Sequence, residues 1–200
     1  MIYTRANEYN ISFKKWCKKK ILEEHNVCCE VIPSNVDEDE AKKSLINEGA
    51  TPLLISKNLA EIKSIRVSIK NPDRIVIGAD SVISLENKLI NKPTDREDAL
   101  RILKELNGKI HYLISSVCIS KNGAMIWNHT DSSELKMKDL NESEIKNYLK
   151  KVNTRTLLDY GVYQVEADGL NLFESIKGDM NSIMGLPIKQ IIDYIKALKK

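Results

Sequence analysis

The chain has 200 residues, a length that fits one domain or two closely packed lobes around a sizeable core. Hydrophobic residues make up 42% and charged residues 30% of it, which excludes a disordered or fibrous protein. No apolar run approaches the roughly 20 residues needed to cross a bilayer, and residues 1–8 lack the apolar core of a signal peptide. We therefore expect a cytoplasmic protein with a single domain, residues 1–200, and no membrane partner.

The net charge of +3 is too small for the electrostatic footprint of a protein that binds nucleic acid broadly. Five lysines nevertheless crowd one short segment: Lys14, Lys15, Lys18, Lys19 and Lys20. Most such runs are solvated helix faces, and the alternative is a helix start that faces phosphate. A nucleic-acid-binding module would rest on this cluster alone, because aromatic residues beyond Trp16 are not interleaved with it. We expect no nucleic-acid partner.

The first half of the chain alternates between short apolar runs and amphipathic stretches. Strands are predicted at residues 11–13, 27–32, 75–77, 82–85 and 89–90. Helices are predicted over residues 15–24, after the acidic loop 34–40, and from the Thr51-Pro52 start to the Asn71-Pro72 stop. An apolar stripe of helical period marks this last helix: Leu54, Ile55, Leu59, Ile62, Ile65 and Ile69.

In the second half, capping residues mark the helix starts: Thr94 with Glu97, Asn141 with Glu144, and Gly185-Leu186-Pro187. Strands are predicted at residues 110–119, 125–128, 134–137 and 170–176. Asn122-Gly123 predicts a tight hairpin between the first two of them. This order of elements indicates an α/β protein with a mixed sheet.

The cysteines and histidines show no metal-ligand spacing. Cys17, Cys28, Cys29 and Cys118 form neither a CxxC pair nor a disulfide framework, so we expect buried or half-buried free thiols. His25, His111 and His129 are far apart, which argues against a structural zinc. For His111, at the start of a predicted strand, a hydrogen-bonded structural role is favoured over a catalytic one.

Three charged residues occupy positions where an α/β protein could bind a ligand. Asp80 follows the buried strand 75–77, so its carboxylate is expected at a strand end. Lys92 lies at the mouth of the next helix, and Glu38 lies in the acidic loop. Carboxylates and lysines together suit a triphosphate, because they supply oxygens for Mg²⁺, cations for phosphate and a base for water. The alternative for Asp80 is an ordinary turn residue.

Several motifs, in order and with matching spacing, resemble the Maf (septum-formation-inhibitor) family. They are Gly78-Ala79-Asp80-Ser81-Val82-Ile83, Asn91-Lys92-Pro93 and Gly108-Lys109-Ile110-His111. Leu59-Ala60-x-x-Lys63, Gly178-Asp179 and Gly185-Leu186-Pro187 extend the likeness. It covers roughly residues 27–200, and several ordered motifs are more specific than any one of them.

The resemblance implies an α/β fold of the inosine-triphosphatase type, with an elongated mixed sheet, flanking helices and two lobes around a cleft. It also implies a divalent cation, Mg²⁺ or Mn²⁺, and a homodimer. By the resemblance, Asp80 is the proton acceptor, and Glu38 and Asp80 share the metal. Lys63 and Lys92 would hold phosphate, while Ser81 and Glu166 would lie near the base.

Two positions distinguish this chain within the resemblance. The family's Ser-x-Ser-x-x-Arg loop is not matched in residues 12–22, where Lys18 falls about where the arginine belongs. A lysine can act as a point charge on phosphate, although it lacks the bidentate fork of arginine. Glu166 could accept hydrogen bonds from a base that presents donors, as the guanine edge does, so a guanine-type or methylated base is expected.

The resemblance implies a nucleoside triphosphate pyrophosphatase, a house-cleaning hydrolase of standard or modified nucleotides that releases a monophosphate and pyrophosphate. The alternative is a catalytically weak, nucleotide-binding regulator of septum formation, which the missing serines of the first motif favour. A nucleotide panel with Mg²⁺ or Mn²⁺ distinguishes the two.

Overall fold

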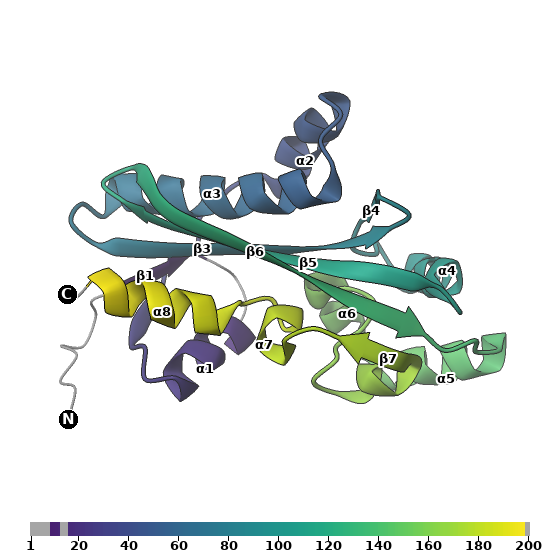
Figure 1. Ribbon diagram of the computed structural model, residues 1–200. Helices are drawn as coiled ribbons and strands as arrows, with labels where there is room; N and C mark the ends of the chain where they lie inside the picture. Colours follow the sequence, from purple (N-terminus) through teal and green to yellow (C-terminus); the bar gives the residue numbers. More distant parts are fainter. Residues whose placement is uncertain (1–8, 13–15, 199–200) are drawn as a thin grey trace.

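The computed structural model of the chain describes residues 9–12 and 16–198. Among these residues, a seven-stranded sheet has the order β2-β1-β3-β5-β6-β7, with β4 paired to β3 (Figure 1). β1 is parallel to β2 and β3, and the other pairs are antiparallel. The predicted α/β fold with a mixed sheet is confirmed. The strands are β1 (Tyr9–Ser12), β2 (Cys29–Val31), β3 (Ile75–Leu85), β4 (Lys88–Ile90), β5 (Ile110–Lys121), β6 (Ala124–Met137) and β7 (Phe173–Lys177).

Helices cover both faces of the sheet. The helices are α1 (Trp16–Glu24), α2 (Glu38–Asn47), α3 (Pro52–Lys70), α4 (Arg96–Leu106), α5 (Glu142–Lys151), α6 (Thr154–Tyr160), the 3₁₀ helix η1 (Asp168–Leu172), α7 (Met180–Ile183) and α8 (Ile188–Leu198). In Figure 1, α3 and α2 lie on one side of the sheet, and α1, α8, α7 and α5 lie on the other. None of the helices in the described part of the chain is long and apolar enough to span a membrane.

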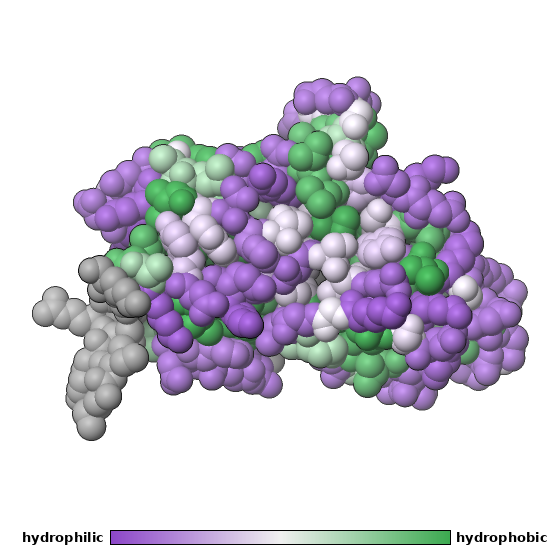
Figure 2. Space-filling model, in the orientation of Figure 1, coloured by the Kyte–Doolittle hydropathy of each residue, from purple (hydrophilic) through white to green (hydrophobic). Residues whose placement is uncertain are grey.

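The two larger of three hydrophobic clusters divide the core along the sheet, as expected for two lobes. One includes Leu103, Leu135 and Leu149 and belongs to the end with α4, α5 and β7. The other includes Leu22 and Ile191 and belongs to the end with α1 and α8. The face shown in Figure 2 is mostly hydrophilic, with separate hydrophobic patches that include the surface where α2 joins the body.

α3 packs on the sheet through only part of the predicted apolar stripe, of which Ile55 and Leu59 are buried as expected. Leu54, Ile62 and Ile69 of the stripe are exposed, with Ile69 at 65%, while Ser64 and Ser68 are buried. Small side chains are buried at this contact because the helix lies very close to β3. A Cβ on Gly78 would stand 2.4 Å from the carbonyl oxygen of Ala60 and 2.7 Å from the backbone nitrogen of Ser64. The buried hydroxyls stay satisfied, since Ser64 Oγ bonds Glu61 O at 3.0 Å and Ser120 Oγ at 2.7 Å.

Several element boundaries differ from the prediction. α4 begins one residue later than the Thr94 cap implies, because Asp95 is the N-cap and accepts from Asp98 N. The predicted strand 27–32 is reduced to β2, which leaves Cys28 exposed, while Cys29 is half-buried and Cys118 buried as expected. The predictions at 125–128 and 134–137 are parts of the continuous β6, and α6 was not predicted.

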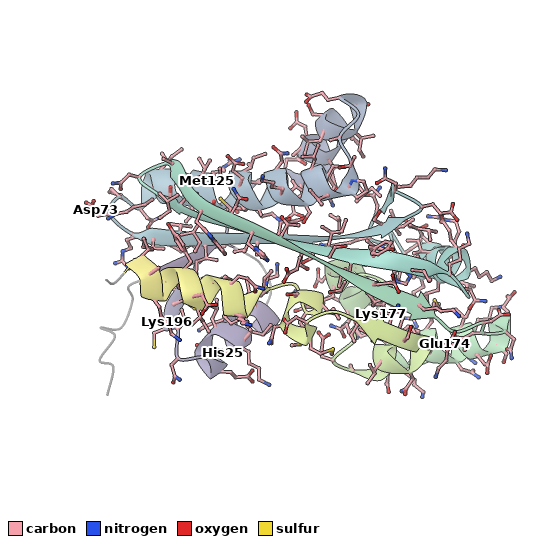
Figure 3. All side chains as sticks on the ribbon, in the orientation of Figure 1. His25, Asp73, Met125, Glu174, Lys177 and Lys196 are labelled. Atoms are coloured by element: carbon pink, nitrogen blue, oxygen red, sulfur yellow. The ribbon has the colours of Figure 1, made fainter. Side chains whose placement is uncertain are left out.

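β7 also starts later than predicted, because residues 168–172 form η1 before the strand begins at Phe173. Two cross-strand ion pairs then hold β7 on β6, at 2.8 Å each: Lys177 with Glu134, and Glu174 with Lys136. Figure 3 labels Lys177 and Glu174 on β7. Exposed pairs of this kind contribute little, typically below about 1 kcal/mol, so β7 depends mainly on Phe173 in the core.

His111 is a structural histidine, as expected. Its ring is fully buried, its Nε2 lies 2.9 Å from the Tyr163 hydroxyl, and it packs against Phe173. Burial lowers the pKa of His111 from 6.5 to about 4. Tyr163 belongs to the loop that lines the pocket described below, so this hydrogen bond ties that loop to β5.

The His111 pKa predicts an acid-sensitive fold. Between pH 6.5 and about 4 only the unfolded state binds this proton, so His111's contribution to stability is complete above pH 6.5 and is lost as the pH falls toward 4. The free energy of unfolding should fall by about 3 kcal/mol over this range from this group. Urea denaturation of wild type and His111→Gln at several pH values checks it. If the free energy of unfolding fell equally steeply with decreasing pH in the two proteins, the prediction would be contradicted.

Candidate active site

Three charged side chains from three elements meet at the junction of α2, α3 and β3. Lys63 Nζ donates to Asp80 Oδ1 at 2.7 Å and lies 2.9 Å from Glu38 Oε1. Lys63 and Asp80 are buried, and Glu38 is about one quarter exposed at 28%. We call Glu38, Lys63 and Asp80 the charged triad. The sequence assigned all three to the site, and the structure brings them together.

The place of Asp80 within its strand corrects the prediction. It does not stand at a strand end, because β3 runs unbroken from Ile75 to Leu85 and Asp80 pairs with Ser116 of β5. Glu38 likewise is not a loop residue, since it opens α2 behind the N-cap Asp37. The polar run in β3 does not end the strand because β5 pairs along its whole length and Lys63 satisfies one Asp80 oxygen.

The contacts within the triad shift the pKa values of Glu38 and Lys63. Burial alone would raise the pKa of Glu38, but the nearby Lys63, with smaller contributions from Lys92 and Lys42, lowers it below 4.5. Burial would lower the pKa of Lys63, but Asp80 and Glu38 outweigh it and raise the pKa above 10.5. These shifts correspond to charged groups that stabilise one another, which is how a protein keeps buried carboxylates ionised.

Beside the triad, one edge of β3 lacks a strand partner among the described residues, which leaves a gap in the sheet. The described pairing of β1 ends at Gly78, and β4 pairs only from Ile83 onward. The edge of β3 between them, residues 79–82, therefore has no described strand beside it. Successive side chains of a strand point to opposite faces, so Asp80 and Ser81 reach this gap from different sides.

A pocket opens at this gap. It is lined by Lys42 of α2, by residues 81–83 of β3, by residues 89–92 at and after β4, by the loop 160–166, and by residues 183–185 after α7. The lining therefore includes the predicted Ser81, Lys92 and Glu166. Lys42, Tyr160 and Gln164 were not predicted. For Lys42 a signal existed, because it follows Glu38 by four residues on a helix.

Lys18 lies beside the pocket residue Gly185, although it belongs to the lysine cluster and does not itself line the pocket. It is only 3% exposed, whereas Lys19 and Lys20 form surface pairs with Glu23 and Glu24. A Cβ built on the pocket residue Gly185 would lie 3.0 Å from Lys18 Cε. The solvated-face interpretation is thus wrong for Lys18 and right for Lys19 and Lys20. Lys14 and Lys15 lie outside the described residues.

Gly185 allows the loop after α7 to pack closely against Ser81 and Lys18. Its φ of +95° favours glycine, and a Cβ there would meet Ser81 Oγ at 2.9 Å as well as Lys18. We expect Gly185→Ala to lower the free energy of unfolding by about 1–2 kcal/mol and to raise the KM for the nucleotide severalfold. Gly49→Ala is the matched control, since Gly49 has φ +78° and open space around it. An unchanged KM for Gly185→Ala would contradict the expectation.

The geometry defines an α/β protein with a charged ligand pocket at a gap in a mixed sheet. The chain belongs to the Maf family, since the sequence model of the family described as Maf-like protein matches residues 17–198.

Curated relatives agree with this membership. The chain is 55% identical to a nucleoside triphosphate pyrophosphatase of Pelagibacter ubique, over 97% of this chain and 100% of the relative. It is 38% identical to a 7-methyl-GTP pyrophosphatase of Brucella abortus, over 83% of each chain. It is 34% identical to a nucleoside triphosphate pyrophosphatase of Paramagnetospirillum magneticum, over 90% of this chain and 92% of the relative.

Proposed function

We propose that this protein is a nucleoside triphosphate pyrophosphatase, which splits a triphosphate between its α and β phosphates into a monophosphate and pyrophosphate. The observation that carries the proposal is the charged triad next to a pocket whose lining includes Ser81, the residue after Asp80, and two further lysines, Lys42 and Lys92. Relatives that align over most of both chains carry this name. The triad supplies a base, and the lysines supply positive charge for the phosphates.

Asp80 acts as the general base. Its Oδ1 is held by Lys63, whereas Oδ2 is buried and has no hydrogen-bond partner among the described residues. A buried oxygen without a partner is costly unless a ligand or water completes it, so Oδ2 is the atom that accepts the proton of the attacking water. The water attacks the α phosphorus, and the bond to the β phosphate breaks. Lys92 and Lys18 stabilise the charge that develops on the phosphates.

The residues fit a divalent cation. The candidate ligands are carboxylate oxygens of Glu38 and Asp80, the kind that Mg²⁺ and Mn²⁺ prefer, and Asp80 would hold the cation through the water whose proton its Oδ2 accepts. Two carboxylates suffice where substrate phosphates and water complete the coordination, as is usual for Mg²⁺. When bound, the cation would neutralise phosphate charge and lower the pKa of a coordinated water.

Glu166 sets the base preference in this proposal. It lines the pocket in the loop 160–166, a different segment from those that carry Lys42 and Lys92. A carboxylate accepts hydrogen bonds from the donor edge of guanine, and its charge favours a cationic methylated base. The 38% identical relative named a 7-methyl-GTP pyrophosphatase is in keeping with this.

A nucleotide panel tests the proposal. Wild type is incubated with GTP, 7-methyl-GTP, dTTP, UTP and ATP in Mg²⁺ or Mn²⁺, and pyrophosphate and orthophosphate are measured separately. We expect pyrophosphate without orthophosphate, fastest with a guanine-type base. A preference for dTTP would refute the role of Glu166. Nucleotide binding with no pyrophosphate release would instead support the regulator, which the unmatched serines near Lys18 favour.

A further inference from the structure

α2 carries one face toward the pocket. Glu38 and Lys42 are four residues apart, which places them on the same side of a helix. Ala41 and Leu45, on the same side, pack against the small apolar cluster under α3. In Figure 1, α2 lies above one end of α3. This face therefore brings Lys42 to the pocket on the side where Glu38 contacts Lys63.

Lys42 has the surroundings of a ligand-binding lysine rather than of a paired surface lysine. It is half-buried and lines the pocket together with Lys92. Within 4 Å it forms no ion pair with any residue that the structure describes, unlike Lys19 or Lys104. The neighbouring Lys43 is exposed and does not line the pocket.

The net charge of the other assigned residues indicates that a further positive charge is needed to bind a triphosphate. Lys63 is shared by Glu38 and Asp80, so the charged triad as a whole is negative. Lys18 and Lys92 offset that charge and the charge of Glu166, which brings the assigned residues to neutrality. A triphosphate tail carries about four negative charges, of which one divalent cation would offset two, so a further lysine in the pocket would strengthen binding at physiological salt.

We propose that Lys42 binds the β and γ phosphates of the nucleotide, as a residue of the leaving pyrophosphate and not of the nucleoside. This inference rests on the proposed function of the same pocket. In the proposed function the nucleoside side is the loop 160–166 with Glu166, whereas Lys42 enters the pocket from α2, the helix whose Glu38 contacts Lys63. Lys42 thus acts on triphosphates and pyrophosphate, while monophosphates do not depend on it.

The experiment compares Lys42→Gln with Lys43→Gln, a neighbouring lysine of the same helix that faces away from the pocket. For Lys42→Gln we expect the KM for the preferred triphosphate to rise roughly tenfold, with kcat changed much less, because a charge-assisted bond to phosphate is lost. Inhibition by inorganic tripolyphosphate should weaken by a similar factor, and inhibition by the monophosphate product should not change. Lys43→Gln should stay within about twofold of wild type.

Lys42→Arg should restore most of the lost affinity, because the positive charge returns on a side chain of similar reach. Thermal unfolding of all variants should coincide. The proposal is overturned if the KM of Lys42→Gln stays within about twofold of wild type, or if monophosphate affinity falls as much as tripolyphosphate affinity. A wild type that releases no pyrophosphate overturns the proposed function instead, and tripolyphosphate calorimetry on wild type and Lys42→Gln then decides the role of Lys42.

Discussion

Asp80→Asn is expected to lower kcat for triphosphate hydrolysis by about 10²–10⁴-fold, since an amide cannot accept the proton of the attacking water. The asparagine keeps the size of Asp80 and an oxygen for Lys63, so the pocket should retain its shape. Nucleotide affinity, measured by calorimetry, should change far less than kcat. Pyrophosphate release at saturating nucleotide is the measurement.

The matched control for this variant is Asp73→Asn. Asp73 is exposed, adopts a positive φ that asparagine tolerates, and precedes β3 near the hairpin that contains Met125. Figure 3 labels Asp73 and Met125 at the end of the sheet far from β7. Asp73→Asn should retain wild-type kcat. Full activity of Asp80→Asn would remove the general base from the mechanism.

Lys63→Met is expected to destabilise the fold by roughly 3–5 kcal/mol, because it leaves two buried or half-buried carboxylates without their shared cation. Methionine preserves the volume of the stem, so the loss reports charge and not a cavity. Urea denaturation at pH 7 measures it. The control Lys70→Met, at the exposed end of the same helix, should cost within about 0.5 kcal/mol.

The ion pair between Lys63 and Glu38 also determines how the stability difference between Lys63→Met and wild type changes with pH. In wild type the pKa of Glu38 is lowered, so its contribution to stability is present above pH 4.5 and is lost as the pH falls through the folded-state value. Without Lys63, burial of the carboxylates favours protonation, and acid relieves their repulsion. The stability gap between Lys63→Met and wild type should therefore narrow below pH 4.5. A gap that stays constant would show that the loss is not electrostatic.

The site residues could be predicted from motifs, but their geometry could not. Glu38, Lys63 and Asp80 were assigned by resemblance, and local pattern placed Asp80 at a strand end. A run of Gly, Ala, Asp and Ser reads as a turn when seen alone. It remains a strand because β5 pairs along it and Lys63 comes from a helix 17 residues earlier. Both are contacts that local periodicity does not contain.

The face of α3 shows the same limit for the fold. Helix, start and stop were predicted correctly from the Thr51 cap and the Asn71 end. Its orientation was predicted only in part, because Ile55 and Leu59 of the apolar stripe are buried, whereas the rest of the stripe is partly exposed and a serine side is buried. Hydrophobic periodicity assumes that size and apolarity decide burial, whereas here the close approach of α3 to Gly78 selects small side chains.

The uncovered segment of β3 between Gly78 and Ile83 has a consequence for how affinity can be altered. Peptide groups along this edge keep hydrogen-bonding capacity that no described strand uses. A molecule seated there can bond to main chain as well as to side chains. That share of the binding would survive side-chain replacements, whereas proline at a position of residues 79–82 whose N–H faces the open edge would remove one of these donors.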